Sequence, residues 1–289
     1  MLRKDFIKLS SLGFLGFYSC GIFNVKNRDK TLAIQLYTVR DAIAENLEKT
    51  LERLAKMGFI GLEIYGYNGT FFGKSRNEFQ SLLNNLGLKV ISSHHTTGIL
   101  HNDKGTLLNN WEKTVDDLHF MGSEYMVCSY LFPEERTFDN YKKLPGLFDK
   151  SGEITKSAGI QFAYHNHDFE FEKFDETQNI YDFILNNTSS DLVKMELDLY
   201  WITKTGIDPL TYFEKYPQRF PLWHVKDMKA KTKDFAEIGN GTIDFKRIFK
   251  AKEKAGLQHW FLEQDSSNKD MFESIEMSKK YIVEHPYFK

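Results

Sequence analysis

The sequence predicts an α/β fold, a single (β/α)8 TIM barrel that occupies residues 31–289. Three observations support this prediction. A unit made of a helical pattern, a glycine and an apolar run recurs along the chain. Further apolar runs fill the gaps between these units, and several of the runs end in histidine or a carboxylate. In a parallel barrel the active site lies at the C-terminal ends of the strands, so the last observation bears on function as well as on fold.

The recurring unit appears five times and places a glycine between helix and strand. A glycine just past a helix is the favoured left-handed cap. The runs that follow are rich in the β-branched and aromatic residues of strands buried on both faces. The helix before the first of these glycines has the matching period, since Leu47, Leu51 and Leu54 share one face. The five glycines are Gly58, Gly87, Gly122, Gly159 and Gly256.

The remaining elements bring the expected count to eight strands and eight helices. The three further strands are expected at 32–39, 193–199 and 222–227. The helices are expected near 41–57, 75–86, 107–121, 138–158, 177–187, 207–216, 243–255 and 269–284. A doubly wound open sheet is the alternative arrangement, but no glycine-rich dinucleotide or phosphate-binding fingerprint follows any expected strand. We expect no second domain.

Composition limits the classes of partner. The chain has 289 residues, of which 41% are hydrophobic and 27% charged, and this suits one sizeable globular domain. The formal net charge is −2 and there is no basic block, so nucleic acid and anionic membrane surfaces are not expected partners. Aromatic residues make up 15%; most are expected in the core, although aromatic side chains also line carbohydrate sites. The two cysteines, Cys20 and Cys128, predict no disulfide framework.

Residues 1–30 have the pattern of an export signal and a short linker. Arg3, Lys4 and Lys8 precede the short apolar stretch 9–20, which is the charge and length pattern of a signal peptide. The run RKDFIK is similar to a degenerate twin-arginine motif, and YSC is similar to the end of a lipoprotein cleavage site. We therefore expect an exported protein, periplasmic or anchored in the membrane by a lipid on Cys20. The alternative is an irregular cytoplasmic N-terminus.

Four of the expected strands break into metal-ligand residue types at their C-terminal ends. The runs FAYHNH, MELDLYW, PLWHVKD and HWFLEQD place there His165 with His167, Asp198, His224 and Glu263. Imidazole and carboxylate without cysteine suit one divalent ion such as Mn, Zn, Co or Fe. Asp198, His224 and Glu263 come from successive strands about 5 Å apart, so they can reach one ion. His165 is the expected fourth ligand.

Other polar side chains are expected at the same rim, facing a substrate. Four of the five capping glycines, all except Gly122, precede a strongly polar residue near the end of the following strand by five to seven positions, which adds Glu63 and His94. Either His94 or His95 faces the site. His167 shares the inward parity of the expected ligand two residues earlier but lies further out. Trp201 is placed to stack on a substrate, although core packing is the other interpretation.

Two further charged residues have open assignments. Glu196 precedes Asp198 by two residues, so it also points into the barrel, where a buried carboxylate needs a partner. That partner is Lys226 or the metal network. Lys226 either takes part in the chemistry of the site or pairs with Glu196 or Asp227.

Together these motifs resemble the sugar phosphate isomerase/epimerase superfamily with a xylose isomerase-like TIM barrel, which includes tagatose epimerase-like and inosose dehydratase-like enzymes. The resemblance covers about residues 31–285 and rests on Asp198, on His224 in HVKD, on Glu263 in LEQD and on the segment EIGNGTIDF. It implies that these three residues, with a carboxylate from strand five, hold one divalent ion, commonly Mn, Co, Mg or Zn. This chain departs from the family at strand five, where His165 stands in place of the usual Glu. A mechanism with two glutamates is therefore not expected.

The resemblance implies a metal-dependent sugar isomerase or epimerase that removes a proton next to a sugar carbonyl. The base would be Glu263 or one of His94, His165 and His167, and Lys226 would stabilise the enolate. Export favours a free sugar or keto-sugar over a sugar phosphate. The main alternative is a periplasmic 3-keto-glycoside lyase or hydratase of the same superfamily.

Two interpretations from other classes stay open. A non-catalytic sugar-binding lipoprotein would share the leader and the aromatic residues, but holding a sugar needs no metal ligands. A phosphoesterase of endonuclease IV type would share the barrel, but its chemistry favours several metal ions and a basic surface. The net charge of −2 argues against the second of these.

Overall fold

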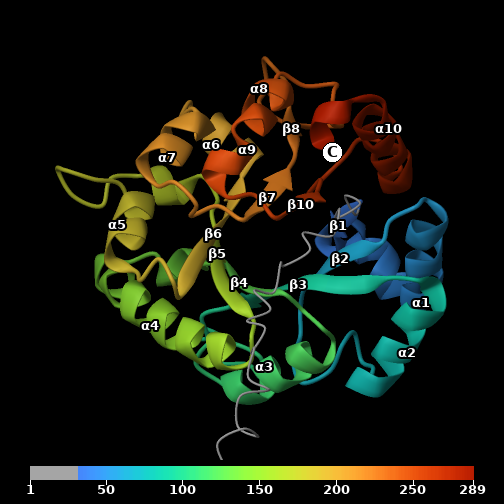
Figure 1. Cartoon of the computed structure of the whole chain (residues 1–289), viewed down its shortest axis with the longest axis horizontal. Coiled ribbons are helices and arrows are strands. Elements are labelled where there is room, and N and C mark those ends of the chain that lie inside the picture. The colour runs from blue at the N-terminus through green and yellow to red at the C-terminus, as the bar shows by residue number, and fades with distance from the viewer. Residues whose placement is uncertain (1–31) are drawn as a thin grey trace, which may run out of the picture. The chain divides into compact units, whose positions relative to one another are not determined.

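The computed structural model describes residues 32–289, in which eight parallel strands form a closed barrel surrounded by helices (Figure 1). The predicted leader and the lipid attachment at Cys20 lie outside the described residues. The barrel order is β1-β10-β7-β6-β5-β4-β3-β2. Its strands are β1 (Ala33–Gln35), β2 (Gly61–Ile64), β3 (Lys89–Thr96), β4 (Tyr125–Tyr130), β5 (Gln161–His165), β6 (Val193–Asp198), β7 (Leu222–Val225) and β10 (His259–Leu262). The predicted (β/α)8 barrel is confirmed.

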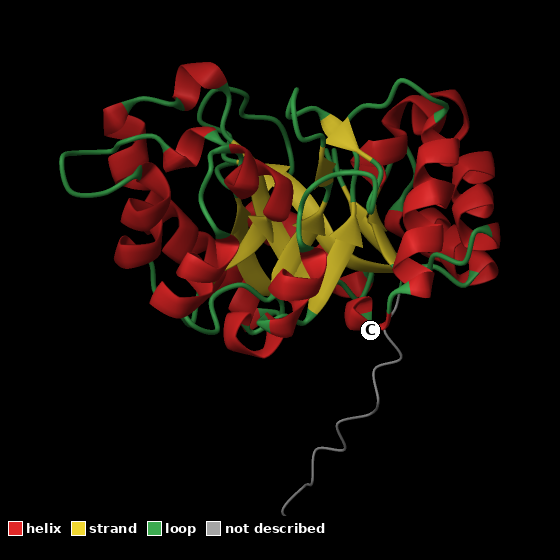
Figure 2. Ribbon diagram, turned by 90° about the horizontal axis from the view of Figure 1, so that it is seen from above, coloured by secondary structure: helices red, strands yellow, loops and turns green. Residues whose placement is uncertain are grey.

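The helices form the outer layer around the strands (Figure 2). The α-helices are α1 (Arg40–Lys56), α2 (Arg76–Leu86), α3 (Trp111–Phe120), α4 (Phe138–Ser157), α5 (Ile180–Asn187), α6 (Leu199–Lys204), α7 (Pro209–Lys215), α8 (Phe245–Lys250), α9 (Lys252–Ala255) and α10 (Met271–Glu284). Short 3-10 helices are η1 (Leu36–Val39), η2 (Pro133–Glu135), η3 (Phe169–Phe171) and η4 (Pro286–Phe288). All five glycines predicted to end helices adopt positive φ values. Gly87, at φ 69°, closes α2, which begins with a capping box between Ser75 and Glu78.

Two predicted strands are shorter in the structure than the sequence pattern indicates. The first strand, expected at 32–39, ends at Gln35, because the Gln35 side chain accepts a hydrogen bond from the Tyr37 amide and turns the chain into η1. The strand expected at 222–227 ends at Val225. Asp227 instead begins a small antiparallel pair outside the barrel, made of β8 (Asp227–Met228) and β9 (Phe235–Ala236).

One helix was not predicted, and two predicted helices differ in the structure. The sequence pattern did not predict α6, which begins directly after β6 because the Asp198 side chain accepts hydrogen bonds from the amides of Tyr200 and Trp201. The helix expected at 243–255 is two helices, α8 and α9, separated at Ala251. The helix expected at 107–121 begins only at Trp111.

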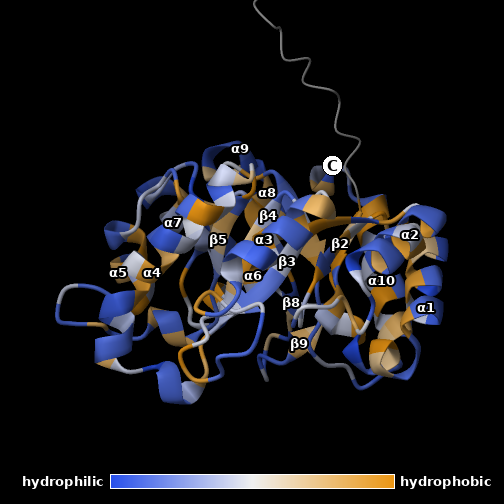
Figure 3. Cartoon of the chain, turned by 90° about the horizontal axis from the view of Figure 1, so that it is seen from below, coloured by the Kyte–Doolittle hydropathy of each residue, from blue (hydrophilic) through white to orange (hydrophobic). Residues whose placement is uncertain are grey.

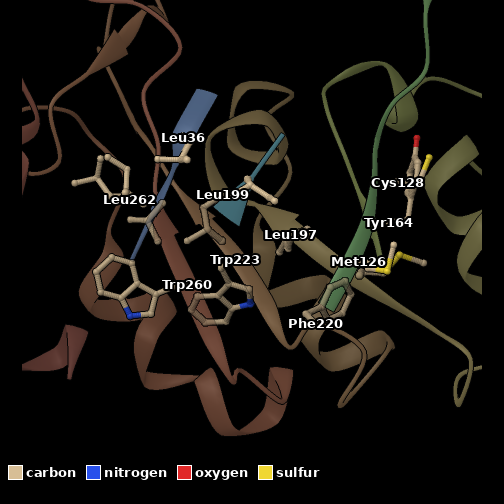
Figure 4. Packing of buried hydrophobic residues seen from close by; sticks show 14 of the residues in the cluster. Leu36, Met126, Cys128, Tyr164, Leu197, Leu199, Phe220, Trp223, Trp260 and Leu262 are labelled. Atoms are coloured by element: carbon tan, nitrogen blue, oxygen red, sulfur yellow. The ribbon is translucent and has the colours of Figure 1, made fainter. Parts of the chain in front are cut away.

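The main core lies between the barrel and the helices. Trp223 stacks on Phe213 at a centroid distance of 5.1 Å, and Figure 4 shows Trp223 and Trp260 beside each other in this layer. Hydrophobic colour is concentrated on the strands and the inner helix faces, while the outer faces are hydrophilic (Figure 3). This is the pattern expected for strands buried on both faces and for amphipathic surface helices.

A second, smaller apolar cluster fills the barrel interior and supports the polar rim above it. The cluster consists of Ala33, Ile91, Tyr125, Val127, Ala163, Leu222 and Phe261. Successive inward positions on one strand are two residues apart, so Ala163 is followed by a polar inward residue, and so are Leu222 and Phe261. The polar side chains of these strands therefore form a layer at the C-terminal rim, directly above the smaller apolar cluster.

The barrel closes through a short seam. A single register pair, Ile34 with Leu262, joins β1 to β10. Just past the seam, the Gln264 amide donates to Thr38 Oγ1 at 3.2 Å, and Arg40 Nη2 donates to the carbonyl of Asp265 at 3.0 Å. Side chains of η1 and α1 thus supplement the few backbone bonds of the seam.

Candidate metal centre and active site

Four side chains at the C-terminal rim form a compact donor cluster, which we call the outer cluster: His165, Asp198, His224 and Glu263. One donor atom from each lies within 4.8 Å of all the others. His165 Nε2 lies 3.1 Å from His224 Nδ1 and 3.4 Å from Asp198 Oδ2. Glu263 Oε2 lies 2.5 Å from His224 Nδ1. All four residues are buried, and they are the four that the sequence predicts as metal ligands.

The outer cluster has the chemistry of a divalent cation site. Asp198 Oδ1 accepts two amide hydrogen bonds at 2.9 Å, which fixes the carboxylate and turns Oδ2 toward the cluster. Asp198 Oδ2 and Glu263 Oε2 are both buried, and each faces a nitrogen of His165 or His224 across the cluster. Two imidazole nitrogens and two carboxylate oxygens suit borderline ions such as Zn²⁺, Mn²⁺ or Co²⁺. The residues present therefore fit the ion that the fold implies.

Lys226 lies at the edge of the outer cluster and is almost fully buried. Its Nζ is 2.7 Å from Glu263 Oε2, 2.8 Å from Asp265 Oδ2 and 3.0 Å from Asp198 Oδ2. Burial would lower the pKa of Lys226, but these carboxylates raise it well above its usual value. The lysine is therefore a fixed cation, and its partners are not the two, Glu196 and Asp227, considered from the sequence.

A second donor group lies deeper in the barrel; we call it the inner cluster: Glu63, His94, Glu196 and His224. His94 Nε2 lies 2.7 Å from Glu196 Oε2 and 3.1 Å from Glu63 Oε2. His224 Nε2, on the other edge of the shared ring, lies 2.5 Å from Glu63 Oε2. Burial would lower the pKa of His94, but the facing carboxylates raise it to about 9. Glu196 thus faces His94 and His224 and not Lys226, and Glu63 is fully buried beside His94.

His94 and His95 point in opposite directions, as neighbours on a strand must. The His95 ring packs edge-on against Trp111 at a centroid distance of 5.1 Å, and its Nδ1–H donates to the Gly105 carbonyl at 2.8 Å. Burial lowers the pKa of His95 to about 3, so the ring is neutral. His95 anchors the loop after β3, and His94 faces the barrel.

A cavity of about 1210 Å³ opens above the outer cluster. Its floor includes His94, His165, Lys226 and Glu263. Aromatic rings form much of its wall, among them Tyr37, Tyr65, Tyr130, Phe132, Phe169 and Trp201. An aromatic wall with a few converging polar groups is typical of a small-molecule site.

His167 lies on the cavity wall, between aromatic rings. Its ring centroid is 5.0 Å from Tyr130 and 5.3 Å from Trp201. Its Nδ1 is buried without a hydrogen-bond partner in the described part of the chain. Burial, with added repulsion from His165 and Lys226, holds the pKa of His167 well below its usual value. The structure thus offers a neutral imidazole beside the donor cluster.

The glycine-rich segment 237–245 is tied to the barrel by Asp227. The Asp227 carboxylate accepts hydrogen bonds from the amides of Gly239 and Gly241 at 2.9 and 3.0 Å, and from the Ile243 amide at 3.1 Å. A Cβ at position 241 would overlap Asp227 Oδ1 and lie 2.6 Å from the Met228 carbonyl. This close approach explains the need for glycine at position 241.

Two residues of the site were not predicted from the sequence. Asp265 is the third partner of Lys226, and its position two residues after Glu263 was the signal that could have found it. Arg136 lies 3.6 Å above the Phe169 ring and donates to the Tyr130 hydroxyl at 2.9 Å, on the cavity wall. Arg136 follows η2 in an irregular loop, where the sequence has no periodicity that would indicate which way a side chain points.

Comparison with known proteins agrees with this architecture. The family model described as xylose isomerase-like TIM barrel matches residues 51–281. The inosose dehydratase of Lacticaseibacillus casei is 24% identical over 269 residues, which cover 81% of this chain and 88% of that protein. The inosose dehydratase of Clostridium beijerinckii is also 24% identical, over 279 residues, with 83% of this chain and 90% of that protein covered.

Solved structures with the same fold include a sugar phosphate isomerase/epimerase from Parabacteroides distasonis, with a TM-score of 0.77 and 30% identity over 92% of this chain and 97% of that one. The IOLI protein with a bound zinc atom has a TM-score of 0.67 and 16% identity over 88% of this chain and 97% of that one. The 3-keto-D-glucoside 4-epimerase YcjR from E. coli has a TM-score of 0.62 and 17% identity over 83% of this chain and 95% of that one. The last two show the fold alone.

Within residues 32–289, no helix is long and apolar enough to cross a membrane. The closed parallel barrel, the donor cluster on its C-terminal rim and the family model that spans most of the chain lead to one conclusion. This chain belongs to the xylose isomerase-like TIM barrel family.

Proposed function

We propose that this protein is a metal-dependent enzyme that removes a proton from the carbon next to a carbonyl of a non-phosphorylated sugar or keto-sugar, and returns it as an isomerase or epimerase. One observation carries the proposal: His165 and Glu263 of the outer cluster line a large aromatic-walled cavity, together with the buried Lys226 and with His167, whose Nδ1 has no hydrogen-bond partner among the described residues. A site that only stored a metal ion would need no such cavity.

The outer cluster would hold the ion, which supplies Lewis-acid stabilisation of the negative charge that develops on a carbonyl oxygen. Lys226 would add a fixed positive charge at the same place, since its pKa is held above its usual range. His167 would accept the carbon-bound proton at Nδ1, the atom that has no partner among the described residues. Trp201, beside His167, would pack on a face of the sugar ring.

The size and lining of the cavity support a carbohydrate substrate. About 1210 Å³ exceeds the upper end of the usual 300–1,000 Å³ range for small-molecule pockets, so a sugar that carries a further group fits. The sequence has no dedicated phosphate-binding loop, which favours a free sugar. Export to the periplasm, or anchoring at Cys20, is part of this proposal and rests on the sequence of residues 1–30.

Elimination is the second candidate reaction, as in a dehydratase or a 3-keto-glycoside lyase. The same first proton transfer, followed by loss of a β-substituent, gives this outcome. Two observations favour it: the curated relatives include several named inosose dehydratase, and His165 replaces one of the two glutamates expected of an epimerase. A protein that binds sugar without turnover would leave the outer cluster unexplained.

Proton exchange measured by NMR tests the proposal. The protein is incubated with Mn²⁺ in D2O and a panel of free ketoses, keto-cyclitols and 3-keto-glucosides. We expect deuterium beside the carbonyl, and loss of this exchange in Asp198→Asn and His167→Gln. The matched control is His119→Gln, a change at an exposed histidine of α3. An epimer as product supports the first reaction and an unsaturated product supports the second. No exchange on any ketone, despite bound metal, contradicts both.

A further inference from the structure

The inner cluster has features that its hydrogen bonds do not explain. Glu63 and Glu196 are both fully buried. Each turns Oε2 toward the same two ring nitrogens, His94 Nε2 and His224 Nε2, at distances from 2.5 to 3.4 Å. Their other oxygens, both named Oε1, have no hydrogen-bond partner among the described residues. Two buried carboxylates with unpartnered oxygens are costly unless a cation compensates them.

Each ring nitrogen of this cluster faces two carboxylate oxygens. A ring nitrogen carries at most one hydrogen, yet His94 Nε2 faces Glu196 Oε2 at 2.7 Å and Glu63 Oε2 at 3.1 Å. His224 Nε2 likewise faces Glu63 and Glu196, at 2.5 and 3.4 Å. The one additional donor among the described residues is Gln35 Nε2, at 2.8 Å from Glu63 Oε2. The shortest distances pair His94 with Glu196 and His224 with Glu63, but all four donor atoms also lie close enough together to bind one ion.

We propose that the inner cluster is a second divalent-cation site, formed by Glu63, His94, Glu196 and Nε2 of His224. One donor atom from each residue lies within 4.8 Å of the others, the same criterion that the outer cluster meets. Two imidazole nitrogens and two carboxylate oxygens form the donor set, which suits Zn²⁺, Mn²⁺, Co²⁺ or Fe²⁺. Gln35, which donates to Glu63, orients that ligand from outside the site.

His224 links the two sites, because its ring separates them. Nδ1 faces the outer cluster, 3.1 Å from His165 Nε2, and Nε2 faces the inner cluster. If both sites were filled, His224 would offer Nδ1 to the outer ion and Nε2 to the inner ion, and the protons on both ring nitrogens would leave to solvent. The inner ion takes no part in the proton transfer proposed above, so the second site stands independently of the proposed function.

Metal content per chain is the decisive measurement. The full chain is stripped with a chelator, reloaded with Co²⁺ by equilibrium dialysis, and analysed for bound metal and for visible absorption. We expect two ions per wild-type chain. Glu196→Gln and His94→Gln, which remove an inner ligand, are each expected to retain one. Asp198→Asn, which removes an outer ligand, is also expected to retain one and to keep the absorption bands that Glu196→Gln loses.

The matched control is Glu170→Gln, an isosteric change at another fully buried carboxylate, which hydrogen-bonds to Tyr164 outside both clusters. This variant is expected to keep two ions. One ion in the wild type that persists in Glu196→Gln and is lost in Asp198→Asn overturns the second site and leaves the proposed function intact. One ion with the opposite pattern supports the inner site and overturns the outer ligand set. No bound ion overturns both, and the His94→Gln result decides the question if Glu196→Gln fails to fold.

Discussion

The ammonium group of Lys226 lies 2.7 Å from Glu263 Oε2, with both side chains buried at the floor of the cavity. Lys226 is also within 3.0 Å of Asp198 Oδ2, so a protein cation and the proposed metal ion share the same carboxylates. With the ion bound, the negative charge of these carboxylates would be compensated partly by the ion and partly by the ammonium group.

Lys226→Met should therefore make folding more dependent on metal. Without the ammonium group, buried carboxylates lose a partner, at a cost of about 3–5 kcal/mol in the metal-free protein. Mn²⁺ should stabilise this variant more than the wild type, because the ion then compensates more of the charge. Thermal unfolding with and without Mn²⁺ measures both effects. Lys204→Met is the control, since its ion pair with Asp168 is partly exposed and is worth less than about 1 kcal/mol. Equal stabilisation of Lys226→Met and wild type by Mn²⁺ would contradict this division of charge.

Gly241→Ala should destabilise the protein through a local overlap. The new Cβ would overlap Asp227 Oδ1, and relief of such overpacking costs about 1–3 kcal/mol. Gly146→Ala is the matched control: Gly146 lies inside α4, and a methyl group added there would meet nothing within 4 Å, so the change should be neutral or gain up to about 1 kcal/mol. Urea unfolding midpoints distinguish the two. Similar midpoints for both variants would show that Asp227 moves aside without cost.

Glu170→Gln should change how stability depends on pH. Burial raises the pKa of Glu170 to about 8, despite hydrogen bonds from Tyr164 and the His167 amide that lower it. The folded protein thus keeps a proton that the unfolded chain releases near its ordinary value of 4.5. Between these two values the wild type loses stability as pH rises, by up to about 1.4 kcal/mol per pH unit. Glutamine does not titrate, so the stability of the variant relative to the wild type should increase between pH 5 and pH 8.

Urea unfolding of both proteins at pH 5, 6.5 and 8 tests this sign, because titrations common to both cancel in the difference. A difference that does not vary with pH would mean that Glu170 is ionised in the folded state.

Trp201→Ala should weaken substrate binding more than it slows turnover. Trp201 lines the cavity beside His167, and loss of an aromatic face that packs on a sugar should raise KM about tenfold, equivalent to about 1.4 kcal/mol. Trp201→Phe keeps an aromatic ring and should recover most of the loss. The KM and kcat of proton exchange separate the two parameters. A fall in kcat with unchanged KM would instead assign Trp201 to the placement of His167.

Much of the fold could be predicted because its signals are periodic. Glycine caps such as Gly87 mark helix ends through backbone sterics, and inward parity on a strand is fixed by the pleat. The same parity predicted the outer cluster, since Asp198, His224 and Glu263 end successive strands. These rules depend on local geometry, which sequence carries directly.

What could not be predicted depends on single contacts across the fold. Gln35 ends β1 early by accepting one amide hydrogen bond, and Asp198 begins α6 with two. The choice of partners by Lys226 depends on distances between strands β6, β7 and β10 that no periodicity encodes. His95 points away from the barrel and hydrogen-bonds to Gly105. Two adjacent histidines in the sequence do not indicate which of them takes this role.

The narrow seam between β1 and β10 has a consequence for how the protein is made. Glu263 follows directly on the strand that closes the ring, and Thr38 and Arg40, from just after the first strand, hold the residues next to it. During synthesis those two segments emerge far apart in time, so the ligand set is incomplete until the last strand has docked on the first. An ion held by the outer cluster would bind only after the barrel has closed. It would then stabilise the closed barrel against separation of β1 from β10, which are joined by a single register pair.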